Sequence, residues 1–448
     1  MIFALYLLVL VLVLAKPIEA FAPGLAEYRV TMVMSLLVFA IAVAGAVRTG
    51  EMAVRTRHLV LLAGLMVAIV LSQAMQGWLG GASQALTEFL PSALLFLTTA
   101  MVVTTTRRLK ATCGLIVLCL LILAIASIAA YHTGFMAEDL IVREGGGAGV
   151  VDYLDVHTGM ELVPADDASG QNLWRVRSWG FFNDPNDFSQ AIVMCIPMLL
   201  GAWLARNSLR NLLRIWLPFA LFLYTIYLTH SRGAMLGLGM MLMYGLLSRA
   251  GVVKASMALA TFAMIGIITG ATGGRGYSSS EESAGGRIAA WSDGLEMLRS
   301  NPLFGVGYGN FTEHFPYTAH NSFVLGFSEL GLFGYFFWIA LLVLAFKEMT
   351  RAVQITHAGM AEHRWSMMLR ISLLGFMTCA MFLSRTYSPT LYVLLALCFS
   401  SLHCAEKAVL AEGQAQLPPV RWMGTVLLAL PASIAAIYLV VRVQNALG

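Results

Sequence analysis

The residues best suited to chemistry stand where polar runs interrupt the apolar sequence. Arg232 lies in the run Thr229-His230-Ser231-Arg232-Gly233, between two strongly apolar segments. An arginine at the centre of a membrane costs about 2.5–3.5 kcal/mol, so one that is kept there generally has an anionic partner. We therefore predict that Arg232 binds an anion, with His230 as a possible supporting residue. The alternative is an arginine that reaches the lipid headgroups from a tight turn made possible by Gly233.

Arg287 is the second candidate for binding an anion. It follows Gly285 and Gly286 and directly precedes a segment of helical pattern, Ile288–Leu298. An anion at the start of that helix would meet both the guanidinium group and the free backbone N–H groups. A solvated loop arginine is the alternative.

His320 is the candidate general base. In the run Ala319-His320-Asn321-Ser322 it precedes the apolar segment that begins at Phe323. An imidazole at this expected membrane–water boundary can be neutral and can accept a proton. Asn321 or Ser322 is expected to cap the following helix, and a histidine beside a cap can equally have a structural role.

Asp184, Asp187, Glu329 and the amide Asn321 could support such a site. Asp184 and Asp187, in Asn183-Asp184-Pro185-Asn186-Asp187, could hold a divalent cation through oxygen ligands. We favour a turn that caps the helix beginning at Phe188, since Pro, Asn and Asp are typical of turns and caps. Glu329 and Arg385 are expected to pair with each other or with polar groups of the bundle.

Other motifs predict no bound metal or cofactor. The glycine-rich run Gly305–Gly309 follows no strand of a βαβ unit, which argues against a dinucleotide site. The six cysteines lie in or beside apolar segments without metal-ligand spacing, so neither structural zinc nor a disulfide framework is expected.

The elements that position these residues must lie in a membrane. Of 448 residues, 59% are hydrophobic and only 12% are charged, with a mean hydropathy of +0.77. A soluble domain carries about 25% charged residues, so a soluble globular enzyme and a disordered chain are excluded. The net charge of +4 is too small to indicate a nucleic-acid partner.

Apolar segments recur along the whole chain at the length of membrane-spanning helices. A helix needs about 20 residues to cross the hydrocarbon core, and stretches such as 115–130 are apolar at every position, unlike barrel strands. We therefore predict an all-α polytopic membrane protein with about 12–13 transmembrane helices in a single integral membrane domain, 1–448. The expected spans begin near residues 1, 30, 59, 89, 111, 188, 211, 232, 252, 323, 369, 389 and 422.

Charge sets the expected orientation. With a cytoplasmic N-terminus, the short inner connections hold seventeen of the 28 Lys and Arg residues, as the positive-inside rule requires. Two long connections, 131–187 and 271–321, then lie outside, where loops of this length are usually functional or disordered. We expect the first helix to be retained, because no basic residue precedes its apolar run, although Ala20-Phe21-Ala22 is similar to a signal cleavage site.

Taken in order, these segments resemble the O-antigen ligase and polymerase superfamily of bacterial envelope glycosyltransferases. The resemblance covers about residues 180–345, and the flanking helices match only in being hydrophobic. The matching stretches are 181–188 (FFNDPNDF), 230–233 (HSRG), 286–291 (GRIAAW), 301–311 (NPLFGVGYGNF), 320–322 (HNS) and 329–334 (ELGLFG).

The resemblance implies a metal-independent, inverting glycosyltransferase of the bacterial inner membrane whose active site faces the periplasm. Family members take a glycan from undecaprenyl diphosphate and use no cofactor. In lipopolysaccharide biosynthesis, a ligase transfers this glycan to lipid A-core. Polymerases use a growing glycan as acceptor and O-oligosaccharyltransferases a protein serine. By motif position, Arg232 and Arg287 match the family's diphosphate-binding arginines and His320 its catalytic histidine. We expect a ligase first and a polymerase second, although the first outer loop is longer than the best-known ligases need and leaves the acceptor open.

Two other classes of protein remain as alternatives. A secondary transporter or lipid flippase would use Glu329, Arg385 and His230 as a proton or anion relay. It should have ionisable residues in several helices and a repeated half-structure, whereas the sequence offers mainly Glu329 and no obvious repeat. A membrane scaffold whose outer loops only bind partners would tolerate replacement of those loops.

Overall fold

The computed structural model describes residues 1–22, 24, 29–145, 151–152, 172–203, 207–268, 282–413 and 420–447. Parts of both expected outer loops (146–150, 153–171 and 271–281) lie outside these ranges.

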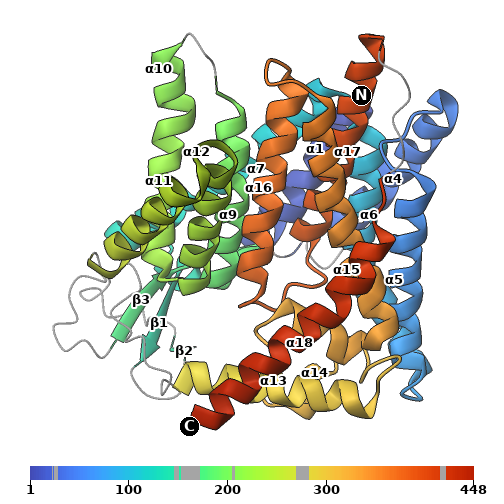
Figure 1. Cartoon of the computed structure of the whole chain (residues 1–448), viewed down its shortest axis with the longest axis vertical. Coiled ribbons are helices and arrows are strands. Elements are labelled where there is room, and N and C mark those ends of the chain that lie inside the picture. The colour runs from blue at the N-terminus through green and yellow to red at the C-terminus, as the bar shows by residue number, and fades with distance from the viewer. Residues whose placement is uncertain are drawn as a thin grey trace.

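The described chain is a bundle of helices with one small sheet (Figure 1), so the predicted all-α polytopic membrane fold is confirmed. In chain order the helices are α1 (Ile2–Leu14), α2 (Pro17–Phe21), α4 (Val30–Thr49), α5 (Thr56–Ala74), α6 (Leu79–Val102), α7 (Thr106–Thr133), α8 (Ala137–Leu140), η2 (Gly180–Phe182), α9 (Pro185–Gly201), α10 (Ser208–Asn211), η3 (Leu212–Trp216), α11 (Leu217–Thr229), α12 (Arg232–Ile268), α13 (Glu282–Ser300), α14 (Phe311–His314), α15 (Ser322–Ile355), α16 (Ala361–Ala380), α17 (Pro389–Ala411) and α18 (Met423–Leu447).

The predicted spans correspond to these helices. Within the described ranges, eight helical segments are long and apolar enough to cross a membrane, and each coincides with a predicted span. The other five predictions fall on shorter or more polar helices, namely α1, α9, α16 and the two halves of α12. The halves of α12 meet at Gly251, whose φ of 81° interrupts the helix.

The described parts of both long connections lie at the same end of the bundle, which we call the outer end. Helix α13 and a three-stranded sheet are found there, at the bottom of Figure 1, whereas the N-terminus lies at the opposite end. The sheet was not predicted. Its strands β1 (Ile141–Gly145), β2 (Val151–Asp152) and β3 (Asn172–Val176) have the order β2-β1-β3 and pair antiparallel, with Ile141 opposite Val176. Strand β3 then leads into η2 and α9.

The second outer loop is fastened to a break in α15. Gly331 has a φ of 60°, and the break leaves backbone groups without helical partners. The loop supplies those partners: the N–H of Val306 donates to Ser328 O at 2.9 Å, and the N–H of Leu332 donates to Pro302 O at 2.8 Å. The chain between α13 and α14 is thus held in place by backbone hydrogen bonds.

The glycines of this loop allow its close approach to α15. A Cβ atom at Gly305 would lie only 2.4 Å from the carbonyl carbon of Glu329, and its φ of 69° also favours glycine. The turn that follows α5 holds the other side, where Gln76 Nε2 donates to Gly305 O at 2.7 Å. The run Gly305–Gly309 therefore serves packing.

Candidate active site

Three arginines converge on one small hollow at the outer end of the bundle. Its volume is about 40 Å³. Arg175 reaches it from β3, Arg232 from the start of α12 and Arg287 from α13. The remaining lining residues are Asn186, His230, Ser231, Gly233, Phe382 and Leu383. The structure thus brings together the two arginines selected from the sequence and adds a third.

The turn between α11 and α12 places His230 and Arg232. Helix α11 ends at Thr229, His230 adopts the left-handed conformation with a φ of 48°, and α12 begins at Arg232. The turn that the alternative for Arg232 assigned to Gly233 is made by His230 instead, because Gly233 is already helical. A Cβ there would lie 3.4 Å from Phe382 Cβ, an ordinary van der Waals distance.

Arg287 lies further inside its helix than predicted. Helix α13 begins at Glu282, so Arg287 is in its second turn and Gly285 and Gly286 are helical. Glycine lowers helix stability by about 1 kcal/mol without ending the helix. An anion bound to Arg287 therefore does not also meet the free N–H groups of the helix start, and that part of the prediction is wrong.

His320 occupies the turn that leads into α15. Its φ is 46°, and the next residue, Asn321, caps the helix by accepting from the N–H groups of Phe323 at 2.9 Å and Val324 at 3.3 Å. The His320 side chain is half-buried. Burial and the positive charge of Arg287 lower the pKa of His320, and Asp184 acts in the opposite direction. His320 is therefore neutral at neutral pH and lies near enough to both groups to be affected by their charges.

Arg175 is the residue that sequence reasoning missed. Its side chain is only 4% exposed, and it donates from Nε to Thr229 O at 2.8 Å and from Nη2 to Asn186 Oδ1 at 2.9 Å. Burial lowers its pKa to about 10, with Asp184 raising it and Arg232 lowering it, so Arg175 is charged at neutral pH. The alternation Trp174-Arg175-Val176-Arg177, typical of a strand, was the available signal.

His230 lines the hollow as a neutral group. Burial, and then the charge of Arg175, lower the pKa of His230 to about 4. The imidazole therefore adds no charge to the three guanidinium groups at neutral pH. It can contribute a hydrogen bond or packing, in keeping with the supporting role expected of it.

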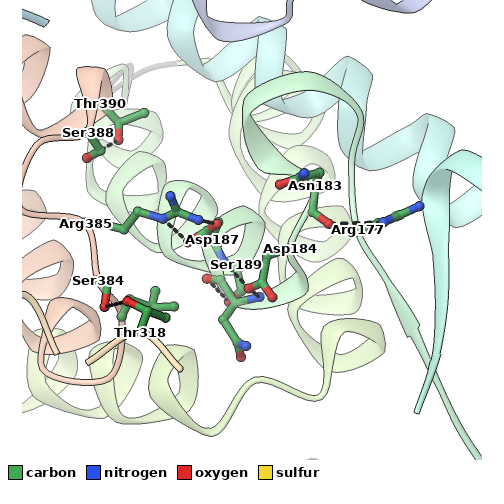
Figure 2. A network of polar contacts seen from close by, with 12 residues as sticks. Arg177, Asn183, Asp184, Asp187, Ser189, Thr318, Ser384, Arg385, Ser388 and Thr390 are labelled. Atoms are coloured by element: carbon green, nitrogen blue, oxygen red, sulfur yellow. Dashed lines mark hydrogen bonds and ion pairs between the residues drawn. The ribbon is translucent and has the colours of Figure 1, made fainter. Parts of the chain in front are cut away.

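Asp184 and Asp187 organise the start of α9. Asp184 Oδ1 accepts from the N–H groups of Asn186 at 2.8 Å and Asp187 at 3.2 Å, so the favoured helix cap is confirmed. Asp187 is buried and forms an ion pair with Arg385 (Figure 2). Both carboxylates thus have partners within the protein. Within the described part of the chain, no group of three or more His, Cys, Asp and Glu side chains could hold a metal ion.

Glu329 does not take part in the hollow. It is 2% exposed, and its Oε1 accepts from the N–H of Phe311 at 3.4 Å, which helps to fasten the second outer loop to α15. The expected pairing of Glu329 with Arg385 is not formed, because Arg385 binds Asp187. The alternative that each pairs with another polar group of the bundle is the one observed.

Comparison with known proteins finds one family that matches part of the chain, and this part includes several residues of the site. Residues 217–339 match a family model described as O-antigen ligase. This segment of the chain is similar to the O-antigen ligase family. The resemblance to the O-antigen ligase and polymerase superfamily is thus confirmed, and no curated protein matches the chain. The matched segment includes Arg232, Arg287 and His320, whereas Arg175 lines the hollow from outside that segment.

Proposed function

We propose that this protein is an O-antigen ligase-like glycosyltransferase. It transfers a glycan from undecaprenyl diphosphate to an acceptor hydroxyl at the periplasmic face of the inner membrane. One observation carries the proposal: Arg175, Arg232 and Arg287, from three separate elements, line one hollow and Arg287 is close enough to His320 to affect its pKa. The O-antigen ligase match over 217–339 supports the same class of reaction.

The arginines are suited to bind the leaving group. As the bond from the anomeric carbon to the diphosphate oxygen breaks, its electron pair leaves with that oxygen and negative charge accumulates there. Guanidinium groups stabilise such charge through bidentate hydrogen bonds, each worth about 1.5–3 kcal/mol. Arg175 is already fixed by Thr229 and Asn186, so little of its freedom is lost when the donor binds.

His320 is suited to accept the proton. The acceptor oxygen forms its new bond to the anomeric carbon opposite the diphosphate, which inverts that centre. The hydroxyl proton passes to the neutral imidazole of His320 and then to solvent. General base catalysis of this kind contributes about 10²–10⁴-fold to the rate.

The hollow must widen for the donor. A cavity needs about 10–15 Å³ of free space for one water molecule, so the present hollow of about 40 Å³ is too small for a diphosphate. We expect the donor to enter at its open side and the side chains of Arg232 and Arg287 to move apart around the phosphates, while Arg175 keeps its place. Asp184 offsets part of their mutual repulsion, since it raises the pKa of Arg175.

The second candidate is a polymerase or protein O-oligosaccharyltransferase of the same superfamily, which shares the donor chemistry and differs only in its acceptor. The transporter alternative receives no support, because Glu329 and Arg385 form separate local contacts.

The full-length protein in nanodiscs should convert undecaprenyl diphosphate-linked glycan and lipid A-core to a conjugate, with release of undecaprenyl diphosphate. Absence of product with lipid A-core, a glycan acceptor and a serine peptide alike would overturn the proposal.

A further inference from the structure

His230 combines an unusual backbone conformation with an unpaired side-chain nitrogen. Its φ of 48° lies in the left-handed region, which among the described residues other than glycine occurs at four further positions. This conformation is uncommon for a residue with a Cβ atom and tends to persist at functional sites. The Nδ1 atom of His230 is buried and has no hydrogen-bond partner in the described part of the chain. A buried polar atom of this kind is destabilising until some group supplies the missing partner.

The imidazole of His230 borders the place where an anion is expected. It lines the same hollow as the three arginines. On its other flank the ring packs beside Tyr227 of α11, with ring centroids 5.8 Å apart and planes inclined by 54°. Guanidinium groups can only donate hydrogen bonds, so a ligand that binds among them presents acceptor oxygens. Such a ligand also offers the partner that Nδ1 lacks.

A neutral imidazole suits this position better than a further cation. Burial, and then the charge of Arg175, lower the pKa of His230 to about 4, so the ring carries one N–H group at neutral pH, and Nδ1 can hold it. A fourth positive charge would be repelled by the three guanidinium groups around a hollow of about 40 Å³. The neutral N–H group provides a directed hydrogen bond without adding to that repulsion.

We propose that His230 is a diphosphate-binding residue whose Nδ1–H donates a hydrogen bond to a phosphate oxygen of the donor. The inference rests on the proposed function and deepens it, because it adds a neutral hydrogen-bond donor to the arginines of the same hollow. As the bond to the anomeric carbon breaks, negative charge accumulates on the diphosphate and strengthens this hydrogen bond. His230 therefore contacts the donor both before and during its departure.

Two substitutions of His230 separate hydrogen bonding from packing beside Tyr227. Glycine and asparagine both tolerate a positive φ, and both remove the ring. Of the two, only asparagine has a side-chain nitrogen that can donate a hydrogen bond from near the position of Nδ1. A role in packing alone would make the two variants equivalent, whereas a hydrogen bond to the diphosphate would not.

Farnesyl diphosphate reports on diphosphate affinity without turnover. It is titrated into the full-length protein in nanodiscs of one phospholipid composition. We expect His230→Gly to bind it about 10- to 100-fold more weakly than the wild type, as for loss of one hydrogen bond to a charged group, and His230→Asn to bind it more tightly than His230→Gly. Wild-type affinity in His230→Gly, or an equal loss in both variants, would overturn the proposal.

Met136→Gly is the matched control for glycine at a positive φ. Met136 precedes α8, has a φ of 53° and does not line the hollow, so we expect wild-type affinity for farnesyl diphosphate. Arg232→Gln tests the proposed function separately. Unchanged affinity in Arg232→Gln would remove the diphosphate from the hollow, whereas a loss in Arg232→Gln together with wild-type affinity in His230→Gly would contradict the His230 assignment alone.

Nitrogen-15 NMR of the histidine-labelled wild-type protein tests the contact directly. The His230 signals are the ones missing from whichever of its two variants folds. We expect saturating farnesyl diphosphate to shift the Nδ1–H signal of His230. An unchanged His230 signal in protein that binds the ligand would overturn the proposal even if neither variant could be titrated.

Discussion

Trp291 Nε1 donates a hydrogen bond to Ala319 O at a distance of 3.1 Å. This bond joins the helix that carries Arg287 to the turn that carries His320. Because Trp291 follows Arg287 by one helical turn, both side chains lie on the same face of α13. The proposed anion-binding group and the proposed base are thus positioned by a shared contact, which is buried.

Loss of this contact should misplace the base without preventing donor binding. Trp291→Phe removes one hydrogen bond, worth about 0.5–1.5 kcal/mol, so we expect kcat to fall several-fold with an unchanged KM for the donor. Steady-state transfer assays check this. Trp365→Phe is the matched control, because Trp365 is also buried and its Nε1 has no hydrogen-bond partner among the described residues. Equal effects of the two substitutions would show that the bond has no positioning role.

Arg175 should be required for donor binding. Arg175→Gln removes the charge, and we expect the donor KM to rise by about 10- to 100-fold, as for loss of one charged hydrogen bond. Arg175→Lys keeps the charge but loses the planar fork, so an intermediate value is expected. Arg299→Gln is the control, since Arg299 is 82% exposed on the same outer end. A donor KM that is unchanged in Arg175→Gln would remove Arg175 from the site.

The ion pair between buried Asp187 and half-buried Arg385 should contribute to stability. Asp187→Asn leaves the guanidinium without its carboxylate, and we expect a loss of about 1–3 kcal/mol, seen as a lower thermal midpoint of the detergent-solubilised protein. Glu296→Gln is the control, because its pair with Arg299 is exposed and such pairs contribute little. Equal midpoints for wild type and Asp187→Asn would contradict this role.

The dependence of activity on pH should reveal the state of His320. Burial and Arg287 lower its pKa below the ordinary value of 6.5, so the imidazole becomes protonated, and unable to act as a base, only at acidic pH. We expect kcat/KM to rise with pH, to pass its midpoint below pH 6.5 and to be level at neutral pH. The parameter kcat/KM is the one to measure, because it reports the pKa of His320 in the free enzyme. A midpoint above 6.5 would exclude a buried imidazole beside Arg287 as the base.

Physical reasons separate what could be predicted from what could not. The helices follow from the sequence because lipid leaves the backbone no other partner, and the side chains at 232, 287 and 320 were found because polar groups are rare between apolar segments. Arg175 was missed because nothing local indicates that β3 passes beneath the end of α11. The partner of Arg385 was also missed, since Asp187 is 198 positions away in the sequence.

One experiment can separate the proposed role of the arginines, donor binding, from the proposed role of His320, proton transfer. Donor binding and single-turnover release of undecaprenyl diphosphate are recorded for wild type, His320→Gln and Arg232→Gln in nanodiscs. We predict that His320→Gln binds donor as the wild type does but releases undecaprenyl diphosphate about 10²–10⁴-fold more slowly, whereas Arg232→Gln loses donor affinity. Release by His320→Gln at the wild-type rate, or unchanged donor affinity in Arg232→Gln, would contradict the account.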